Sequence, residues 1–224
     1  MSDTIKSVSD LDKILNKYDD QWTIFRGVKD AAYHRLIPKI GREGSLKKLE
    51  YQEFLYEENF IFRLFKERSR LYLSYEPKND WEWLSIAQHY GLLTRLLDWT
   101  RNILVAAYFA VEKPFDGDSA IYVYKIKGFV DTDTNTNPFN TSEVAKYIPS
   151  RISQRITAQD GLFTIHPNPL EEMDNDEIQK ILITKDARRS IKKRLNKYGI
   201  HRGSLFPDLD GISSHINWLR TIKH

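Results

Sequence analysis

The chain has 224 residues, of which 41% are hydrophobic and 29% charged, a composition typical of a soluble globular protein with a sizeable core. It contains no cysteine, which excludes disulfides, thiolate metal ligands and a cysteine nucleophile, and its net charge of +3 is too small to indicate a nucleic-acid partner by itself. No run approaches the roughly 18 apolar residues of a membrane span, and residues 1–13 lack the apolar stretch of a secretory signal. We therefore expect a cytoplasmic protein with no membrane partner.

The first predicted elements are a helix over residues 7–18 and a strand over residues 21–27. The strand ends in Arg26 and Gly27. A glycine at this point lets the backbone turn or lets a ligand come close. Arg26 is therefore either a strand-end arginine that pairs with a carboxylate or a residue that contacts a ligand.

Residues 46–73 carry a long helical pattern, and a second helix is predicted over residues 80–89. Glu53 and Glu57 lie four residues apart on one face of the first helix, and a solvated helix face explains them better than an acid–base pair does. We expect one domain spanning residues 1–224, with residues 46–90 as a candidate helical insert.

Residues 81–112 form the densest apolar region, yet several polar residues lie within it. Burying such groups without partners costs roughly 1–3 kcal/mol each, so they must be paired in the core or line a site. Arg95 and Asp98 fall on opposite faces of a predicted strand and need separate partners; Arg26 with Asp98 is one plausible structural pair. The polar residues in question are Gln88, His89, Thr94, Arg95, Asp98 and Thr100.

The remaining elements alternate between strands and helices. We expect an α+β fold in which a mostly antiparallel or mixed sheet is surrounded by helices. The polar segment 128–142 is a candidate lid or substrate loop. The predicted elements are a helix over 102–113, a strand over 119–126, a short helix and then a strand or turn around 159–166, a strand over 180–185, a helix over 185–199, and a closing helix over 212–223 with Ile212, Ile216 and Leu219 inside.

Helix ends are marked by capping residues along the chain. Gly91 and Gly199 stop the helices that precede them. The predicted N-caps are Ser7 or Ser9, Asn79 (with Glu82 completing a capping box), Thr100 or Asn102, and Thr184.

The helix over residues 185–199 has a strongly basic side. Such a face can follow a phosphate backbone, although a run of charge is more often simply a solvated face. The candidate nucleic-acid contacts are Arg188, Arg189, Lys192, Lys193 and Arg194.

Four separated stretches resemble the FRG domain family, which is named after a Phe-Arg-Gly motif. The first is Phe25-Arg26-Gly27, followed by Pro38 and Arg42, and the second is WEWLSIAQHYGLLTRLLDWTRNILVAAYFAV. RITAQDGLFTIHP and GIHRGSLFPDLDGI resemble the later parts of the family, so the resemblance covers nearly the whole chain after Gln21. Leu93 departs from the pattern, because the family more often has proline there.

A weaker resemblance connects the chain to the ADP-ribosyltransferases. Those enzymes have an arginine at the end of a first strand, a Ser/Thr-bearing strand that leads into an Ala-rich helix, and a late acidic or polar residue. Arg26, the stretch from Thr94 to Thr100 and Gln159 follow in that order. The resemblance implies NAD as a co-substrate, no metal, and transfer to a protein or nucleic acid, by a toxin or phage-defence effector.

The same resemblance implies roles for individual residues. Arg26, His89 and Gln159 would be catalytic, with Gln159 in the position where these enzymes usually have a glutamate. The implied NAD contacts are Arg26, Gly27, Tyr90, Thr94, Thr100 and Phe163, of which Tyr90 or Phe163 would stack on the nicotinamide.

Alternative interpretations remain at the level of sequence. His89 ends a predicted helix, where it either caps or bridges the core or acts in ligand binding or acid–base chemistry. The whole protein is alternatively a non-catalytic module that binds nucleic acid or protein, or a purely structural interaction domain. No P-loop, Rossmann or hydrolase motif is present, and no His/Asp/Glu set has metal-ligand spacing.

Overall fold

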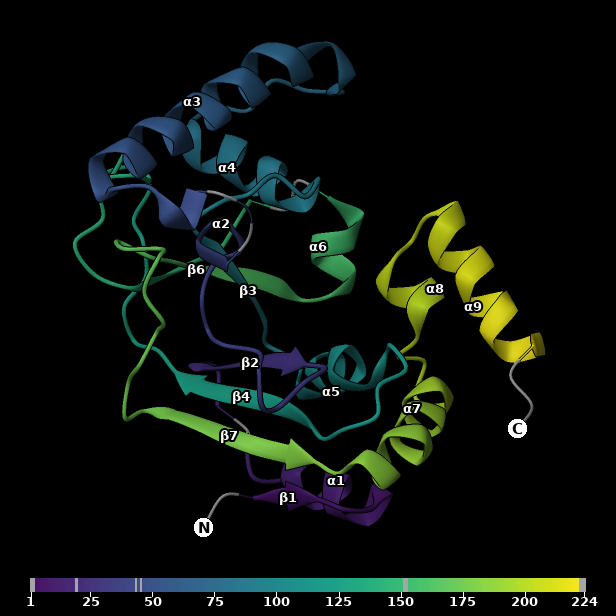
Figure 1. Cartoon of the computed structure of the whole chain (residues 1–224). Helices are drawn as coiled ribbons and strands as arrows, with labels where there is room; N and C mark the ends of the chain where they lie inside the picture. The colour runs from purple at the N-terminus through teal and green to yellow at the C-terminus, as the bar shows by residue number, and fades with distance from the viewer. Residues whose placement is uncertain (1–2, 19, 43, 45, 151–152, 222–224) are drawn as a thin grey trace.

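The computed structural model describes residues 3–18, 20–42, 44, 46–150 and 153–221. Its described strands form one sheet with helices packed around it, so the predicted α+β class is confirmed (Figure 1). No helix formed by these residues is long and apolar enough to cross a membrane.

In chain order the elements are β1 (Thr4–Ile5), α1 (Val8–Leu15), β2 (Thr23–Val28), α2 (Lys39–Arg42), η1 (Leu46–Lys48), α3 (Tyr51–Ser69), η2 (Arg70–Tyr72), α4 (Asp80–His89), β3 (Leu96–Thr100), α5 (Ile103–Val111), β4 (Ser119–Lys125), β5 (Ala145–Tyr147), α6 (Gln154–Ala158), β6 (Gly161–Ile165), β7 (Ile178–Ile183), η3 (Lys185–Ala187), α7 (Arg188–Lys197), α8 (Arg202–Leu205) and α9 (Leu209–Thr221).

The sheet is mixed and mostly antiparallel, with strand order β1-β7-β4-β2-β3-β6-β5. Only β1, which pairs with β7, lies parallel to its neighbour among the described pairs. β2 pairs with β4 along its whole length but with β3 only at Phe25 opposite Thr100. The sheet therefore consists of two halves that touch at one register position and diverge beyond it.

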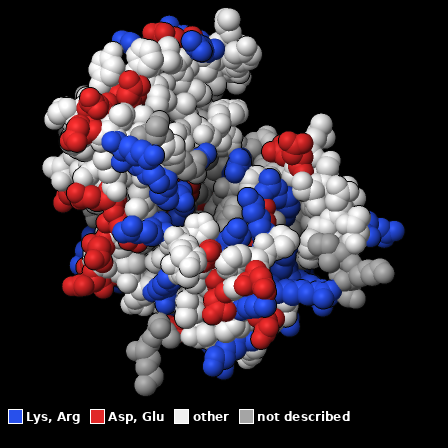
Figure 2. All heavy atoms as spheres, viewed as in Figure 1, with Lys and Arg blue, Asp and Glu red and all other residues white. Residues whose placement is uncertain are grey.

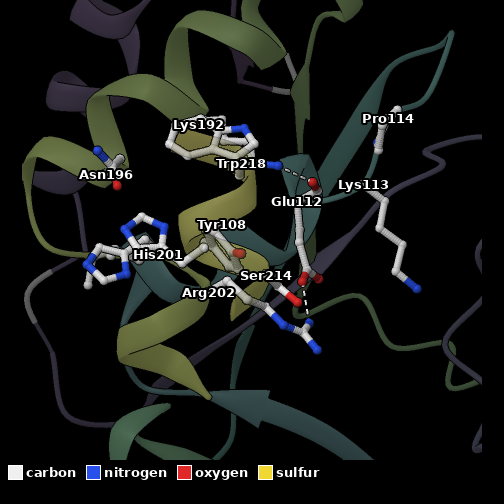
Figure 3. Close-up of a pocket in the computed structure, with 12 residues that line it drawn as sticks. Tyr108, Glu112, Lys113, Pro114, Lys192, Asn196, His201, Arg202, Ser214 and Trp218 are labelled. Carbon is white, nitrogen blue, oxygen red and sulfur yellow. Dashed lines mark hydrogen bonds and ion pairs between the residues drawn. The ribbon is translucent and has the colours of Figure 1, made fainter. Parts of the chain in front are cut away.

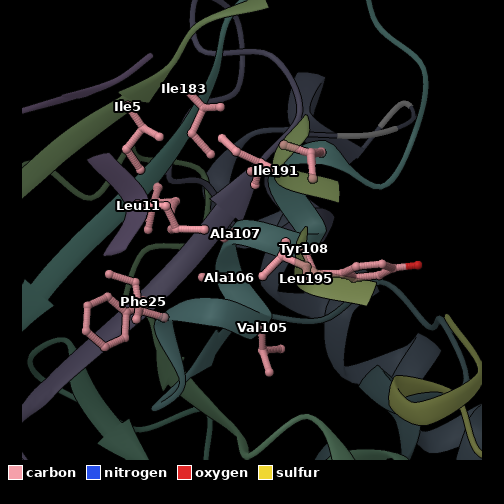
Figure 4. Packing of buried hydrophobic residues seen from close by; sticks show 14 of the residues in the cluster. Ile5, Leu11, Phe25, Val105, Ala106, Ala107, Tyr108, Ile183, Ile191 and Leu195 are labelled. Carbon is pink, nitrogen blue, oxygen red and sulfur yellow. The ribbon is translucent and has the colours of Figure 1, made fainter. Parts of the chain in front are cut away.

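The larger core lies on one face of β2, β4 and β7, under α1, α5 and α7 (Figure 4). Helix α5 is apolar nearly all round, as a central core helix should be. It packs closely on β2 because Gly27 faces it: a Cβ built at Gly27 would lie 1.8 Å from the main-chain oxygen of Ala106. The absence of a side chain at Gly27 thus sets the distance between strand and helix.

The second half of the sheet is covered by α3 and α4, and one buried ion pair ties this layer to the strand. Arg95 immediately precedes β3, and its Nε donates to Glu58 Oε1 of α3 at 2.9 Å. The two side chains are 1% and 2% exposed, and Arg95 Nη2 also contacts Glu58 Oε2. Arg95 therefore has a partner other than Asp98, as its position in the sequence requires.

Most predicted helix ends are confirmed. Ser7, Asn79 and Asn102 cap α1, α4 and α5 through their side chains, and Gly91 and Gly199 have φ of 88° and 79°. The Thr184 prediction is wrong, since its side chain makes no capping hydrogen bond. Strand β5 was not predicted.

The closing helix α9 is turned differently from the prediction. Ile212, Ile216 and Leu219 are 48%, 52% and 37% exposed rather than inside. The inner side is formed by Gly211, against the backbone of Phe206, and by His215, whose ring stacks on His201. The predicted end of this helix, residues 222–223, lies outside the described residues.

Candidate functional site

A cleft of about 680 Å³ opens where the two halves of the sheet diverge. Figure 2 shows Lys and Arg side chains on both sides of a hollow near the centre of this face. The walls come from β2, α2, the end of α4 and the turn after it, the end of β3, the end of α5 and helix α6. The polar and charged residues that line it are Arg26, Lys29, His34, Lys39, Arg42, Gln88, His89, Tyr90, Asp98, Thr100, Glu112, Lys113, Arg155 and Gln159.

Arg26 bridges the gap between the diverging strands. Its Nη1 donates to the main-chain oxygen of Asp98 at 2.6 Å and lies 3.6 Å from the Asp98 carboxylate. The predicted pairing of these residues is therefore confirmed, but Asp98 is not buried: its side chain is 59% exposed, against 16% for Arg26. Burial lowers the pKa of Arg26, and the charge of Asp98 opposes that shift.

The cleft carries an excess of positive charge. Six cationic side chains line it, whereas its carboxylates are Asp98 and Glu112, and Glu112 also pairs with Arg202. Among the described residues Arg42 makes no ion pair, and the Nε atoms of Arg26 and Arg42 are buried without a hydrogen-bond partner. A cleft of this kind concentrates anions, and arginines that lack partners suit phosphate or carboxylate groups.

The last turn of α4 and the residue that follows it bring Gln88, His89 and Tyr90 to the cleft. Gln88 Nε2 donates to Asp98 Oδ1 at 3.0 Å, which positions that carboxylate from the side opposite Arg26. His89 Nδ1 lies 3.4 Å from the Ser153 hydroxyl, and burial, with a smaller effect of Arg155, lowers the pKa of His89. Its imidazole is therefore neutral at pH 7 and able to accept a proton.

Gln159 lies at the end of α6 rather than on a strand. Its Nε2 donates to the main-chain oxygen of Leu205 at 3.0 Å, while no described hydrogen bond reaches its Oε1. Thr100 is fixed beside it, because its hydroxyl donates to the Gln159 main-chain oxygen at 2.7 Å. Asp160 follows in a left-handed turn with φ 44°.

Two predicted ligand contacts are placed in the core. Thr94 is 1% exposed, and its hydroxyl donates to Gln88 Oε1 at 2.6 Å. Phe163 is 5% exposed and stacks on Tyr147. Neither residue lines the cleft, so the expected contacts of Thr94 with ribose and of Phe163 with nicotinamide are corrected: Thr94 orients Gln88, and Phe163 fills the core.

The basic side of α7 is also less open than its sequence predicted. Arg188 is 6% exposed, and its Nη2 donates to the main-chain oxygen of Lys113 at 2.6 Å. Lys192 donates to the main-chain oxygen of Glu112 and lies 5.4 Å from the Trp218 ring centre. Both cations therefore anchor α7 to its neighbours, which leaves Arg189, Lys193 and Arg194 as the more accessible part of the predicted phosphate-binding face.

A second cavity, of about 210 Å³, lies among α5, α7, α8 and α9 (Figure 3). It shares Glu112 and Lys113 with the cleft. Figure 3 shows Glu112 between Lys192 and Arg202, which contact its main-chain oxygen and its carboxylate respectively. This arrangement holds the end of α5, and with it one wall of the cleft.

The fold and the cleft define an α+β protein with a basic site between two halves of a sheet. The FRG domain family model matches residues 21–119, a segment that supplies β2 with Arg26, the turn with His89, and β3 with α5. This match confirms the predicted resemblance to the FRG domain family over residues 21–119. No curated protein and no solved structure matches the chain. Arg155 and Gln159 reach the same cleft from the part that follows the match.

Proposed function

We propose that the cleft binds NAD and that the protein is an NAD-dependent ADP-ribosyltransferase-like enzyme that modifies a protein or a nucleic acid. One observation carries the proposal: six residues selected for this chemistry from separate stretches of sequence line a single basic cleft. They are Arg26, Gly27, His89, Tyr90, Thr100 and Gln159.

The charge and size of the cleft suit a dinucleotide. Arg26 and Arg42 would hold the pyrophosphate, since planar guanidinium groups pair well with phosphate oxygens. Both arginines line the cleft, and Arg42 has no ion-pair partner among the described residues. The volume of about 680 Å³ lies within the range of roughly 300–1,000 Å³ found for cofactor sites.

The residues of the cleft also match the demands of the transfer. The bond between nicotinamide nitrogen and ribose carbon breaks with its electron pair on nicotinamide, and the acceptor bonds to that carbon and loses a proton. The Asp98 carboxylate would offset positive charge at the ribose. Gln159 Oε1 would accept from a ribose hydroxyl, and neutral His89 would take the proton.

The test has two readouts on the full chain. The first is the nicotinamide released from NAD, and the second is the transfer of a label in the adenylate part of NAD to acceptors in a cell lysate. Arg26→Lys keeps the charge but removes the guanidinium fork, so we expect the rate to fall by about 100-fold or more. Arg63→Lys is the matched control, because Arg63 is 64% exposed on α3 and is not among the residues that line the cleft. An unmodified chain that releases no nicotinamide, or an Arg26→Lys variant with full activity, contradicts the proposal.

The second candidate is a module that binds its ligand without catalysis. It is favoured by the pairing of both cleft carboxylates with arginines, because Asp98 lies against Arg26 and Glu112 against Arg202. A partly neutralised carboxylate stabilises a developing positive charge less well. Saturable NAD or nucleic-acid binding without nicotinamide release would identify this alternative.

An enzyme that consumes NAD would act as a toxin or a phage-defence effector, the role implied by the ADP-ribosyltransferase resemblance. Induced expression in a bacterial host should then stop growth and deplete cellular NAD. The Arg26→Lys variant, expressed to the same level, should do neither. Unimpaired growth with normal NAD in cells that contain the folded, unmodified chain contradicts this role.

A further inference from the structure

A smaller pocket of about 140 Å³ adjoins the cleft at the end of α4. His89 and Tyr90 line both, so the pocket and the cleft share a wall. Apolar side chains from α4 and α6 form part of its walls. Its principal lining residues are Tyr72, Tyr75, Ile86, His89, Tyr90 and Ile156.

The tyrosines of this pocket are unusually exposed. Tyr72, Tyr90 and Tyr75 are 87%, 71% and 38% exposed, and none of their hydroxyls hydrogen-bonds to another described residue. They contribute little to the core, in contrast to Tyr147, which is 2% exposed and accepts a hydrogen bond from Ser85. Clustered, solvent-facing aromatic rings beside a cleft are typical of a binding surface.

The adjacent charge indicates the kind of ligand. The cleft next to these rings is also lined by Lys39 and Arg155, two cations that the proposed NAD site does not use. A cationic groove beside stacking rings is how proteins hold single-stranded nucleic acid: the groove follows the backbone and the rings stack on bases. A duplex offers no unstacked base to such a pocket, and 140 Å³ is space for one ring system rather than for a peptide segment.

We infer that this surface binds single-stranded nucleic acid, with one base in the tyrosine pocket and the backbone of the strand along Lys39 and Arg155. The strand is then the acceptor in the proposed transfer, a role that rests on the proposed function. The binding of the strand does not depend on the proposed function. This inference places the nucleic-acid contact at the cleft instead of on α7, where Arg188 and Lys192 donate hydrogen bonds to the main chain of the protein.

The binding is tested with fluorescein-labelled mixed-sequence 12-mers of single-stranded RNA and DNA and with the matching duplex, by anisotropy at several salt concentrations. We expect single strands to bind at least tenfold more tightly than the duplex, with affinity falling as salt rises. Tyr72→Ala with Tyr90→Ala should weaken binding by about 5- to 100-fold, the range expected for loss of base stacking. Tyr56→Ala is the control, because Tyr56 is 67% exposed on α3 outside the pocket, and thermal melting verifies that all variants fold.

The same samples are then supplied with labelled NAD. This step distinguishes failure of the inferred binding from failure of the proposed enzyme activity. Binding of single strands that depends on the tyrosines supports the inference even if no nicotinamide is released, and in that case only the proposed enzyme activity fails. No binding of single strands, equal binding of duplex, or tyrosine variants that bind normally overturns the inference. Label that enters protein alone, with no oligonucleotide bound, overturns it as well while the enzyme activity stands.

Discussion

Arg26 Nη1 lies 2.6 Å from the main-chain oxygen of Asp98, directly beyond the single position at which β2 and β3 pair. A side chain thus takes the place that a strand hydrogen bond would occupy in a continuous sheet. The gap it spans is the cleft, so Arg26 both supports the opening and lines it.

Gly27 lines the cleft and is also expected to matter for folding. Gly27→Ala would place a Cβ 1.8 Å from the Ala106 main-chain oxygen, and backbone cannot yield as a flexible side chain does. We expect the free energy of unfolding to fall by about 3 kcal/mol or more, measured by urea denaturation. Gly128→Ala is the control, because a Cβ there meets no atom within 4 Å, and it should change stability by less than about 1 kcal/mol. Equal unfolding midpoints for the two variants would contradict the close packing of α5 on β2.

The buried pair of Arg95 and Glu58 should dominate the stability of the α3 layer. Glu58→Gln leaves an unpaired charge beside Glu58's former position, and breaking such a pair typically lowers stability by about 3–5 kcal/mol. Glu57→Gln serves as the control, because Glu57 is adjacent on α3 and makes no ion pair among the described residues. Differential scanning calorimetry should show a large drop in Tm for Glu58→Gln only. Equal Tm values for Glu58→Gln and Glu57→Gln would contradict the stabilising role of the Arg95–Glu58 pair.

His166 should make the protein acid-sensitive. Burial, with smaller effects of Arg26 and Arg95, lowers the pKa of His166 to about 4, against about 6.5 in the unfolded chain. Between these values the unfolded state binds the extra proton, so the stabilising contribution is complete above pH 6.5 and is lost as pH falls to about 4. The difference of about 2.5 pKa units corresponds to about 3 kcal/mol.

The measurement is the free energy of unfolding at pH 7 and pH 4.5 for the original chain and for His166→Asn. Asparagine retains a polar group beside the Thr164 hydroxyl, which lies 2.9 Å from His166 Nε2. The variant should lose less stability on acidification than the original chain. Identical pH dependence would show that His166 is not the responsible group.

Local features of the fold could be predicted from sequence because their causes are local. Asn79 and Asn102 cap helices through neighbouring backbone groups, and Gly91 adopts a conformation that other residues avoid. The partner of Arg95 could not be predicted, because Glu58 is separated from it by 37 residues and resembles its solvent-facing neighbours Glu53 and Glu57.

The wrong predictions likewise concern features that depend on contacts between distant parts of the chain. The aliphatic stripe of α9 was expected to face inward. In the structure Gly211 packs against Phe206 and the half-buried His215 stacks on His201 instead. The predicted site residues mostly converge because they flank β2 and β3, which meet at the cleft. Arg155 was missed, since only the tertiary fold brings α6 to this site.

The central claim is that the Arg26 cleft binds NAD, and isothermal titration of NAD into the full chain tests it most directly. Loss of charge-assisted hydrogen bonds from Arg26 in Arg26→Gln should weaken binding at least about tenfold, whereas Arg63→Gln should bind like the original chain. Melting temperatures of both variants establish that they are folded. Failure of the original chain to bind NAD at millimolar concentration, or equal affinity in folded Arg26→Gln, would contradict the account.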